Sequence, residues 1–222
     1  NHLAEETNEV KIGTTKKGNG PAYRDKYDRK GLRTEDMPCF DEYLIDIYEE
    51  LHSDNNVNVL FEGAQGFGLD IDWGDYPYVT SSHCTSASAL LNGVPPQAVN
   101  RVWGVAKAYE TYVGNKKFEP KDDIFSMIRK IGLEYGATTG RPRQCNWLNW
   151  DFLEKAAKIN GVTDVVFNKM DVLHNVNRWV LLDEGKKVKF DNEDGMKSWI
   201  KKKFSSFSTP PKLYFSGNPS KI

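Results

Sequence analysis

The chain has 222 residues, of which 39% are hydrophobic and 27% are charged, and its formal net charge at pH 7 is −1. This length is enough for one well-buried core, and the near-zero charge gives no reason to expect a nucleic-acid or membrane surface. The three cysteines, Cys39, Cys84 and Cys145, show no CxxC spacing. We therefore expect no zinc site and no disulfide framework, and we expect a reducing, cytoplasmic location.

The first half of the chain predicts loops and short helices around one strand. Residues 1–35 are polar and glycine-rich and predict loop with short helical pieces. The apolar spacing of 40–51 predicts a helix, and the apolar run 57–61 predicts a short buried strand. A helix is expected over 86–92, and Pro95 prevents its continuation.

The second half predicts strands that alternate with helices. The expected strands span 102–111, 163–167, 178–182, 187–190 and 212–215, and the expected helices span 122–130, 151–159 and 193–204. The segments 178–182 and 187–190 predict a hairpin because Asp-Glu-Gly lies between them. The alternation predicts an α/β fold with a largely parallel central sheet and helices on both faces.

A glycine-rich polar segment follows the strand predicted over 57–61. It reads FEGAQGFGLDIDWGDYPYVTSSHCT and occupies 61–85. Ligands of open α/β sheets bind beyond the carboxyl ends of strands. The glycines permit a close approach of backbone to a ligand, and Gln65 and Thr80 offer neutral hydrogen bonds. Composition alone favours an ordinary surface loop.

A second segment, TDVVFNKMD at 163–171, predicts a strand that runs into an N-K-x-D loop. The carboxylate of Asp171 can accept both the ring N–H and the exocyclic amine of guanine, whereas adenine presents the wrong donors. Asn168 can reach the opposite edge of the base, and the stem of Lys169 can lie over it. The alternative is a turn at a strand end with a solvated aspartate.

A third segment, GATTGRPR at 136–143, places two threonines and two arginines around a glycine. The planar fork of arginine suits carboxylate and phosphate oxygens. Gly136 and Gly140 suggest a loop that can close over a substrate. A flexible surface loop with two solvated arginines is the alternative.

Four segments together resemble the adenylosuccinate synthetase family, in the order that the family has. They are IGTTKKGNGPAY at 12–23, the EGAQG and VTSS block within 61–85, YGATTGRPR at 135–143 and NKMDVL at 168–173. The resemblance implies a P-loop-NTPase-like synthetase fold in which 1–222 forms a single domain. The family's N-terminal phosphate loop is not in this sequence, so we expect a fragment or a compact variant.

The resemblance implies a ligase that joins L-aspartate to IMP at the expense of GTP, with Mg²⁺, and gives adenylosuccinate for AMP biosynthesis. It also implies a homodimer in which Arg29 reaches the IMP phosphate of the neighbouring subunit. Two alternatives stay open. One is a viral-type relative that acts on dGMP to make a 2-aminoadenine precursor. The other is a guanine-nucleotide-binding module without ligase activity.

The resemblance also implies the site residues. Those for IMP are Thr15, Arg29, Gln65, Thr80 and Arg141. Those for aspartate are Ala137, Thr138, Thr139, Gly140, Arg141, Pro142 and Arg143. Those for GTP are Arg143, Lys169, Met170, Asp171, Ser216, Gly217 and Asn218.

Three features qualify these assignments. Gly217-Asn218 departs from the family form, which is closer to S-x-G-P, and His83 stands where the family usually has Asn. Asp70 and Asp72 have a spacing that could suit a metal, but a structural hydrogen-bonding role is expected. The general-base aspartate, the catalytic histidine and the metal ligand are expected in the missing N-terminal part, so no catalytic or metal residue is assigned here.

Overall fold

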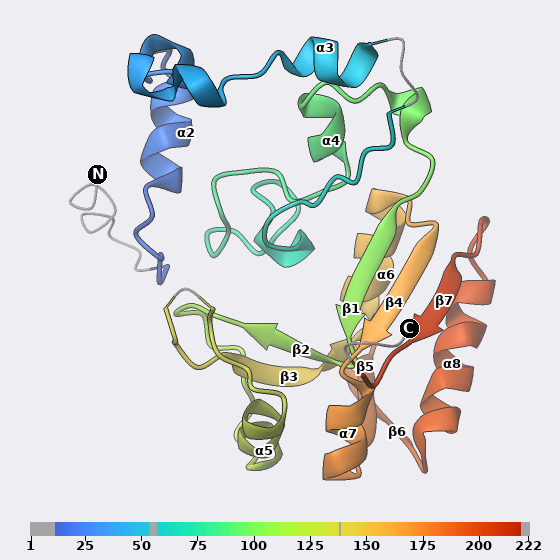
Figure 1. Cartoon of the computed structure of the whole chain (residues 1–222). Coiled ribbons are helices and arrows are strands. Elements are labelled where there is room, and N and C mark those ends of the chain that lie inside the picture. The colour runs from blue at the N-terminus through green and yellow to red at the C-terminus, as the bar shows by residue number, and fades with distance from the viewer. Residues whose placement is uncertain (1–11, 54–56, 138, 219–222) are drawn as a thin grey trace. The chain divides into compact units, whose positions relative to one another are not determined.

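The computed structural model describes residues 12–53, 57–137 and 139–218, and the chain divides into two compact units, 1–100 and 101–222 (Figure 1). The described part of the first unit consists of short helices and long loops, and the second is an α/β unit. Within the described residues, no helix combines the length and the apolar character needed to cross a bilayer.

The helices in the described part of the first unit are short. They are α2 (Asn19–Tyr27), α3 (Ile47–His52) and α4 (Ala87–Leu91), with 3-10 turns at Thr34–Asp36, Pro38–Tyr43, Phe67–Leu69 and Pro96–Ala98. Asp46 starts α3 by accepting hydrogen bonds from the N–H groups of Tyr48 (2.9 Å) and Glu49 (3.2 Å). This cap divides the helix predicted over 40–51 into a 3-10 turn and α3, because Asp46 favours a new helix start.

The strand predicted over 57–61 is wrong. The segment has no strand partner, and Leu60 is 89% exposed. A strand forms where a neighbour satisfies its backbone N–H and C=O groups. The described part of the first unit contains no other strand, so the apolar run alone cannot form one.

The second unit alternates strands and helices as predicted. Its strands are β1 (Trp103–Lys107), β2 (Tyr109–Tyr112), β3 (Gln144–Asn149), β4 (Asp164–Asn168), β5 (Trp179–Asp183), β6 (Lys186–Phe190) and β7 (Lys212–Phe215). Its helices are α5 (Ile124–Ile131), α6 (Trp150–Asn160), α7 (Met170–Val176) and α8 (Glu193–Ser205). The α/β class and the hairpin β5–β6 are confirmed.

The strands form two sheets. One is fully parallel, in the order β1-β4-β7. The other has the order β2-β3-β5-β6 and is mixed, because only β3 and β5 run parallel. The single strand predicted over 102–111 is therefore wrong in one respect: it breaks at the fully buried Ala108, and its two halves join different sheets.

An aromatic core holds the parallel sheet against α6 and α8. The rings of Trp150 and Phe204 meet edge to face with centroids 5.0 Å apart, and Phe167 stacks on Phe215 at 5.2 Å. Burial of one such ring stabilises a fold by about 1.5–3 kcal/mol. The strand β4 is buried along most of its length, which accounts for its continuous apolar sequence.

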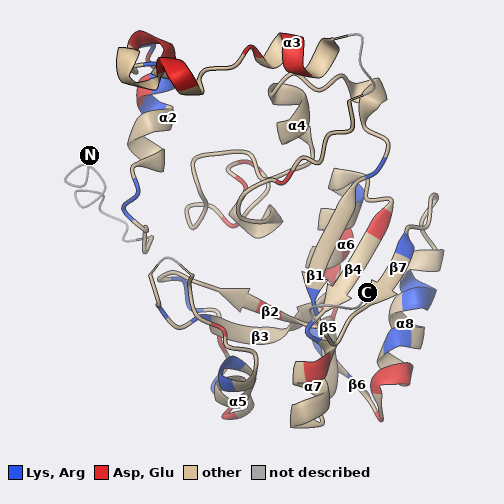
Figure 2. Cartoon of the chain, in the orientation of Figure 1, with Lys and Arg blue, Asp and Glu red and all other residues tan. Residues whose placement is uncertain are grey.

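The basic clusters at 186–189 and 201–203 lie on β6 and on α8, whose lysines are visible in Figure 2. Lys203 donates to Asp183 at 2.8 Å and lies 4.8 Å from the ring centroid of Trp199. At least this lysine contributes to packing within the unit.

An ion pair with a buried carboxylate fixes the amino-terminal end of the parallel sheet. Asp164, 1% exposed, accepts from Arg101 Nη2 (2.5 Å) and Nε (3.1 Å) and from the Thr163 hydroxyl (2.7 Å). The hydrogen bond from Arg101 is the main cause that lowers the pKa of Asp164 to about 2, against the opposing effect of burial.

We predict that Asp164→Asn lowers the free energy of unfolding at pH 7 by about 1–2 kcal/mol. This loss lies at the low end of the range for a buried group that loses a hydrogen-bond partner. The reason is that the Arg101 side chain is half exposed, so solvent screens the ion pair. The folded pKa is depressed, so the contribution is present above the unfolded pKa of about 3.9 and is lost as pH falls toward 2. Urea unfolding followed by tryptophan fluorescence measures it. A difference between the two proteins that stays constant from pH 6 to pH 2 would contradict the assignment.

Candidate functional site

Two polar segments follow strands at the carboxyl end of the parallel sheet. The register pairs Lys107 at the end of β1 with Asn168 at the end of β4, and Phe167 with Phe215 at the end of β7. The chain therefore leaves β4 into 169–171 and leaves β7 into 216–218 at the same edge (Figure 1). Ligands of parallel α/β sheets bind at this kind of edge.

The two segments predicted to bind guanine lie in contact. The N–H of Met170 donates to the carbonyl of Ser216 at 3.2 Å. A Cβ added to Gly217 would lie 3.3 Å from the amide nitrogen of Asp171, so a glycine lets the two loops approach. The side chain of Asp171 lies in the first turn of α7 and is exposed.

The residues on either side of the strand end are also held in place. Lys169 adopts a left-handed conformation with φ 63°, and its Nζ donates to the carbonyl of Gly132 at 3.0 Å. The Oδ1 of Asn168 is buried and has no hydrogen-bond partner among the described residues. A buried acceptor of this kind normally finds a partner, so the loop offers an unfilled polar position.

The arginine-containing loop over 136–143 is closed by backbone contacts. A bridge pairs Tyr135 with Pro142, and the N–H of Gly136 donates to the carbonyl of Arg141 at 2.9 Å. Gly140 has φ 63°, where glycine is favoured. Arg141 Nε lies 3.4 Å from the hydroxyl of Thr139. The loop also contains Ala137, which is exposed, and Thr138, which lies outside the described residues.

The buried glutamate Glu134 precedes this loop and contacts its last residue, Arg143. Glu134, 2% exposed, accepts from Arg143 Nη1 at 3.0 Å and from Lys107 Nζ at 2.7 Å. The carbonyl of Glu134 accepts from the N–H of Arg143 at 3.0 Å. Glu134 and Lys107 did not appear in the sequence prediction. In the sequence, only their positions point to a role: Glu134 directly precedes the motif that begins at Tyr135, and Lys107 lies at the end of a strand.

The first unit carries the other four predicted residues. Thr15 precedes α2, and Arg29 follows it with an exposed side chain. Gln65 has φ 63°, and the N–H of Thr80 donates to the carbonyl of Leu69 at 2.8 Å. The predicted site residues are therefore divided between the two units: Thr15, Arg29, Gln65 and Thr80 belong to the first, and the others belong to the second.

A buried aspartate organises the loop that contains Gln65 and Thr80. Asp70 is fully buried, and its carboxylate accepts from the N–H groups of Asp72 (2.9 Å), Trp73 (3.0 Å) and Cys84 (2.5 Å). Burial alone would raise the pKa of Asp70, but these hydrogen bonds lower it. A Cβ on Gly74 would lie 2.6 Å from the carbonyl oxygen of Asp70, so this turn requires glycine.

Among the described residues, one group of three side chains has the spacing of a metal site. The ligand atoms of Asp70, Asp72 and His83 lie within 4.8 Å of one another, and His83 Nδ1 is 3.4 Å from Asp72. Mg²⁺ prefers an all-oxygen octahedron with several waters. The Asp70 carboxylate already takes three backbone hydrogen bonds, and His83 offers nitrogen, so this group does not fit Mg²⁺. The geometry supports the structural role expected for Asp70.

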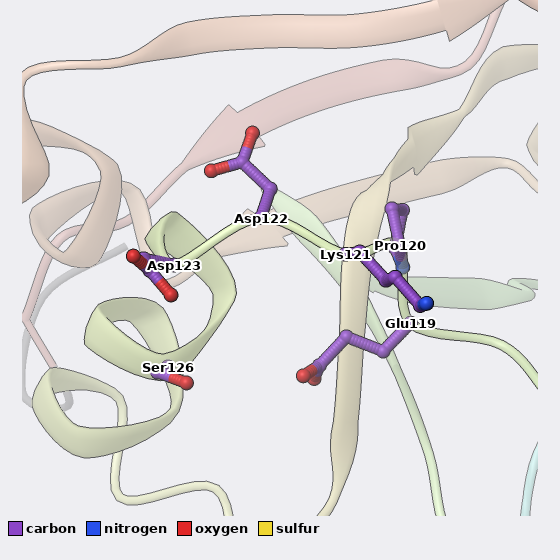
Figure 3. Close-up of a pocket in the computed structure, with 6 residues that line it drawn as sticks. All are labelled: Glu119, Pro120, Lys121, Asp122, Asp123 and Ser126. Atoms are coloured by element: carbon purple, nitrogen blue, oxygen red, sulfur yellow. The ribbon is translucent and has the colours of Figure 1, made fainter.

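A shallow hollow of about 670 Å³ lies elsewhere on the second unit. Figure 3 shows its lining, which is Glu119, Pro120, Lys121, Asp122, Asp123 and Ser126. The carboxylate of Glu119 is already bound by Arg129 and by the N–H of Cys145 (2.7 Å). None of the predicted site residues lines this hollow, and its other two acids, Asp122 and Asp123, are exposed.

Comparisons with known proteins agree with the motifs. The model of the adenylosuccinate synthetase family matches residues 1–54 and 37–182. The adenylosuccinate synthetase of Desulforamulus reducens is 40% identical over 217 residues, which covers 76% of this chain and 51% of the relative. That of Brugia malayi is 39% identical over 219 residues, which covers 78% of this chain and 50% of the relative.

Two solved structures share the fold. The fully ligated adenylosuccinate synthetase from Plasmodium falciparum has a TM-score of 0.78 at 26% identity and covers 98% of this chain and 73% of its own. The succinoaminodeoxyadenylate synthetase of cyanophage S-2L, bound to dGMP and dATP, has a TM-score of 0.68 and covers 98% and 62%. At 20% identity, that likeness concerns the fold alone.

The chain spans about half the length of the curated relatives that it matches. The family model nevertheless matches most of its residues, and these include the loops at 61–85, 135–143 and 168–173. The chain therefore belongs to the adenylosuccinate synthetase family.

Proposed function

We propose that the complete protein joins L-aspartate to IMP with the hydrolysis of GTP and gives adenylosuccinate. The observation that carries the proposal is the contact between the two loops after β4 and β7, where Gly217 packs against Asp171. An exposed carboxylate beside a backbone loop suits the N–H donors of guanine. The resemblance to dGMP-using relatives rests on fold alone and does not favour that substrate here.

In this proposal each loop binds a different substrate. Lys169, Met170, Asp171 and the 216–218 segment take the guanine nucleotide, and Arg143 lies toward it. The loop 137–143 takes the carboxylates of aspartate through Arg141, whose fork suits two carboxylate oxygens. Catalysis then rests on positioning and on stabilisation of charge in phosphoryl transfer.

In this proposal IMP binds to the side chains of Thr15, Arg29, Gln65, Thr80 and Arg141.

Mg²⁺ would accompany the phosphates of GTP. The cluster of Asp70, Asp72 and His83 does not suit this ion. The cytoplasmic location and the single-domain organisation over 1–222 stay predictions.

We predict that Asp171→Asn weakens GTP binding by about 1–3 kcal/mol, because the amide leaves one guanine donor without an acceptor. The same change should improve binding of xanthosine triphosphate, whose 2-carbonyl can accept from the new amide. Titration calorimetry with GTP, ATP and xanthosine triphosphate measures both effects in the complete protein. Asp191→Asn, an exposed aspartate between β6 and α8, is the matched control. Unchanged GTP affinity in Asp171→Asn would remove this residue from the site.

We predict that Arg141→Leu raises the apparent KM for aspartate by about tenfold or more, or abolishes turnover, because it removes the fork that binds a carboxylate. The affinity for GTP should stay nearly intact. Steady-state kinetics with varied aspartate provide the measurement, and Arg178→Leu, an exposed arginine between α7 and β5, is the control. A normal aspartate dependence would show that Arg141 does not serve this step.

We also propose a homodimer in which the exposed Arg29 acts on the IMP site of its partner. Mixing Arg29→Leu with Asp171→Asn, each nearly inactive alone, would then place both defects in one site and leave the other intact. Activity should recover to roughly a quarter of the wild-type value by random pairing. Arg33→Leu in place of Arg29→Leu is the control, because Arg33 pairs locally with Glu35. An inactive mixture in which heterodimers are shown to form would place the action of Arg29 within its own subunit or outside the site.

A further inference from the structure

A single buried carboxylate faces several cations beside the carboxyl end of the parallel sheet. The Oε2 of Glu134 accepts from Lys107 and from Arg143, and its Oε1 accepts from the Tyr109 hydroxyl at 2.7 Å. Burial would raise the pKa of Glu134, but these hydrogen bonds and the two positive charges lower it. Glu134 is therefore ionised at neutral pH and compensates part of a positive cluster.

The cluster keeps an excess of positive charge. Burial lowers the pKa of Lys107, and the neighbouring charges of Arg143 and Lys169 lower it further, while Glu134 acts in the opposite direction. Lys107, Arg143 and Lys169 against the carboxylates of Glu134 and Asp171, whose charge also acts on Tyr109, leave a local charge of about +1. Buried or half-buried charges of one sign are costly unless a partner compensates them, so an arrangement that retains this excess suits an anion.

The surrounding packing fixes where Glu134 can lie. A Cβ on Gly132 would come within 2.3 Å of the Tyr109 hydroxyl and 3.3 Å of Glu134 Cγ, so a glycine is required beside this group. The carbonyl of the same Gly132 accepts from Lys169. Arg129 Nε donates to the carbonyl of Arg143 at 2.6 Å. The carboxylate thus links the end of β1 to the end of the arginine-containing loop, and the neighbouring carbonyl of Gly132 contacts the N-K-x-D loop through Lys169.

The two cations on Glu134 are anchored but not enclosed. The side chains of Lys107 and Arg143 are 22% and 30% exposed, against 2% for Glu134. An anchored arginine with part of its fork open can meet a phosphate with little loss of side-chain entropy. We propose that Glu134 is a positioning residue that holds Arg143 and Lys107 as a cationic pair for the phosphates of GTP. The inference rests on the proposed function, since it assumes GTP at this edge.

The variant Glu134→Gln separates positioning from simple electrostatics. Removal of the negative charge raises the local charge from about +1 to about +2, which by itself would tighten the binding of an anion. Loss of the anchor frees Arg143 and would weaken binding. We expect the dissociation constant for GTP to rise about tenfold, which is opposite in sign to the electrostatic effect alone. Titration calorimetry of the complete protein gives this constant.

Asp164→Asn is the matched control. Asp164 is likewise a buried carboxylate bound to an arginine, but it begins β4, whereas Asn168 ends it. This variant should lose stability and keep the GTP dissociation constant within roughly twofold, as distant sites do. A weakening of GTP binding in both variants would mean that Glu134 acts only through general stability, and would overturn the proposal.

A double-mutant cycle tests whether Glu134 acts through Arg143. In an Arg143→Gln background, Glu134→Gln should change the GTP dissociation constant by less than about twofold. If Glu134→Gln fails to fold, Glu134→Asp keeps the charge but draws the carboxylate back from Arg143, and it should bind GTP about tenfold more weakly than wild type.

The outcomes separate the two proposals. A folded Glu134→Gln protein that binds GTP as tightly as wild type, or more tightly, overturns the positioning role and leaves the proposed function intact. A wild-type protein that binds GTP without joining aspartate to IMP overturns the proposed function, and the positioning role is then judged on the same dissociation constants. A wild-type protein that binds no GTP overturns both.

Discussion

The parallel pairing of β1, β4 and β7 is the constraint on which the second unit depends. Parallel strands end at the same edge, so Lys107, Asn168 and Phe215 terminate together although they are far apart in the sequence. The aromatic stack of Phe167 on Phe215 fixes the register from within the core. A shift of one residue would turn these side chains to the other face of the sheet, and it would separate the two loops that now touch.

Both units use a buried carboxylate to shape a polar loop. Asp70 gathers three backbone N–H groups in the first unit, and Glu134 gathers the hydroxyl of Tyr109 and two cations in the second. Each acid is buried and already accepts three hydrogen bonds from the protein, so its main role is structural. Their effect is to limit the conformations of neighbouring groups, which is how a folded protein pre-organises a binding site.

Local sequence predicted the elements whose signals are local. The helix predicted over 151–159 forms as α6, which Gly161 ends with φ 60°, and the hairpin β5–β6 follows from its Asp-Glu-Gly turn. The predictions failed where the pairing of strands determines the secondary structure. The run 57–61 has the composition of a strand but no neighbour, and the run 102–111 divides because its halves pair in different sheets. The strand β3 was missed because its sequence, QCNWLN, is poor in β-branched residues.

The sequence by itself determined the family and marked three loops of the candidate site, because those motifs consist of contiguous residues whose chemistry can be recognised without coordinates. It could not determine that the loop at 216–218 touches the loop at 169–171, or that Glu134 anchors Arg143 and Lys107. These are contacts between distant segments, and they follow from strand order and side-chain packing. A glutamate in the sequence has the same appearance whether it is solvated or buried among cations, and only the tertiary structure decides between the two.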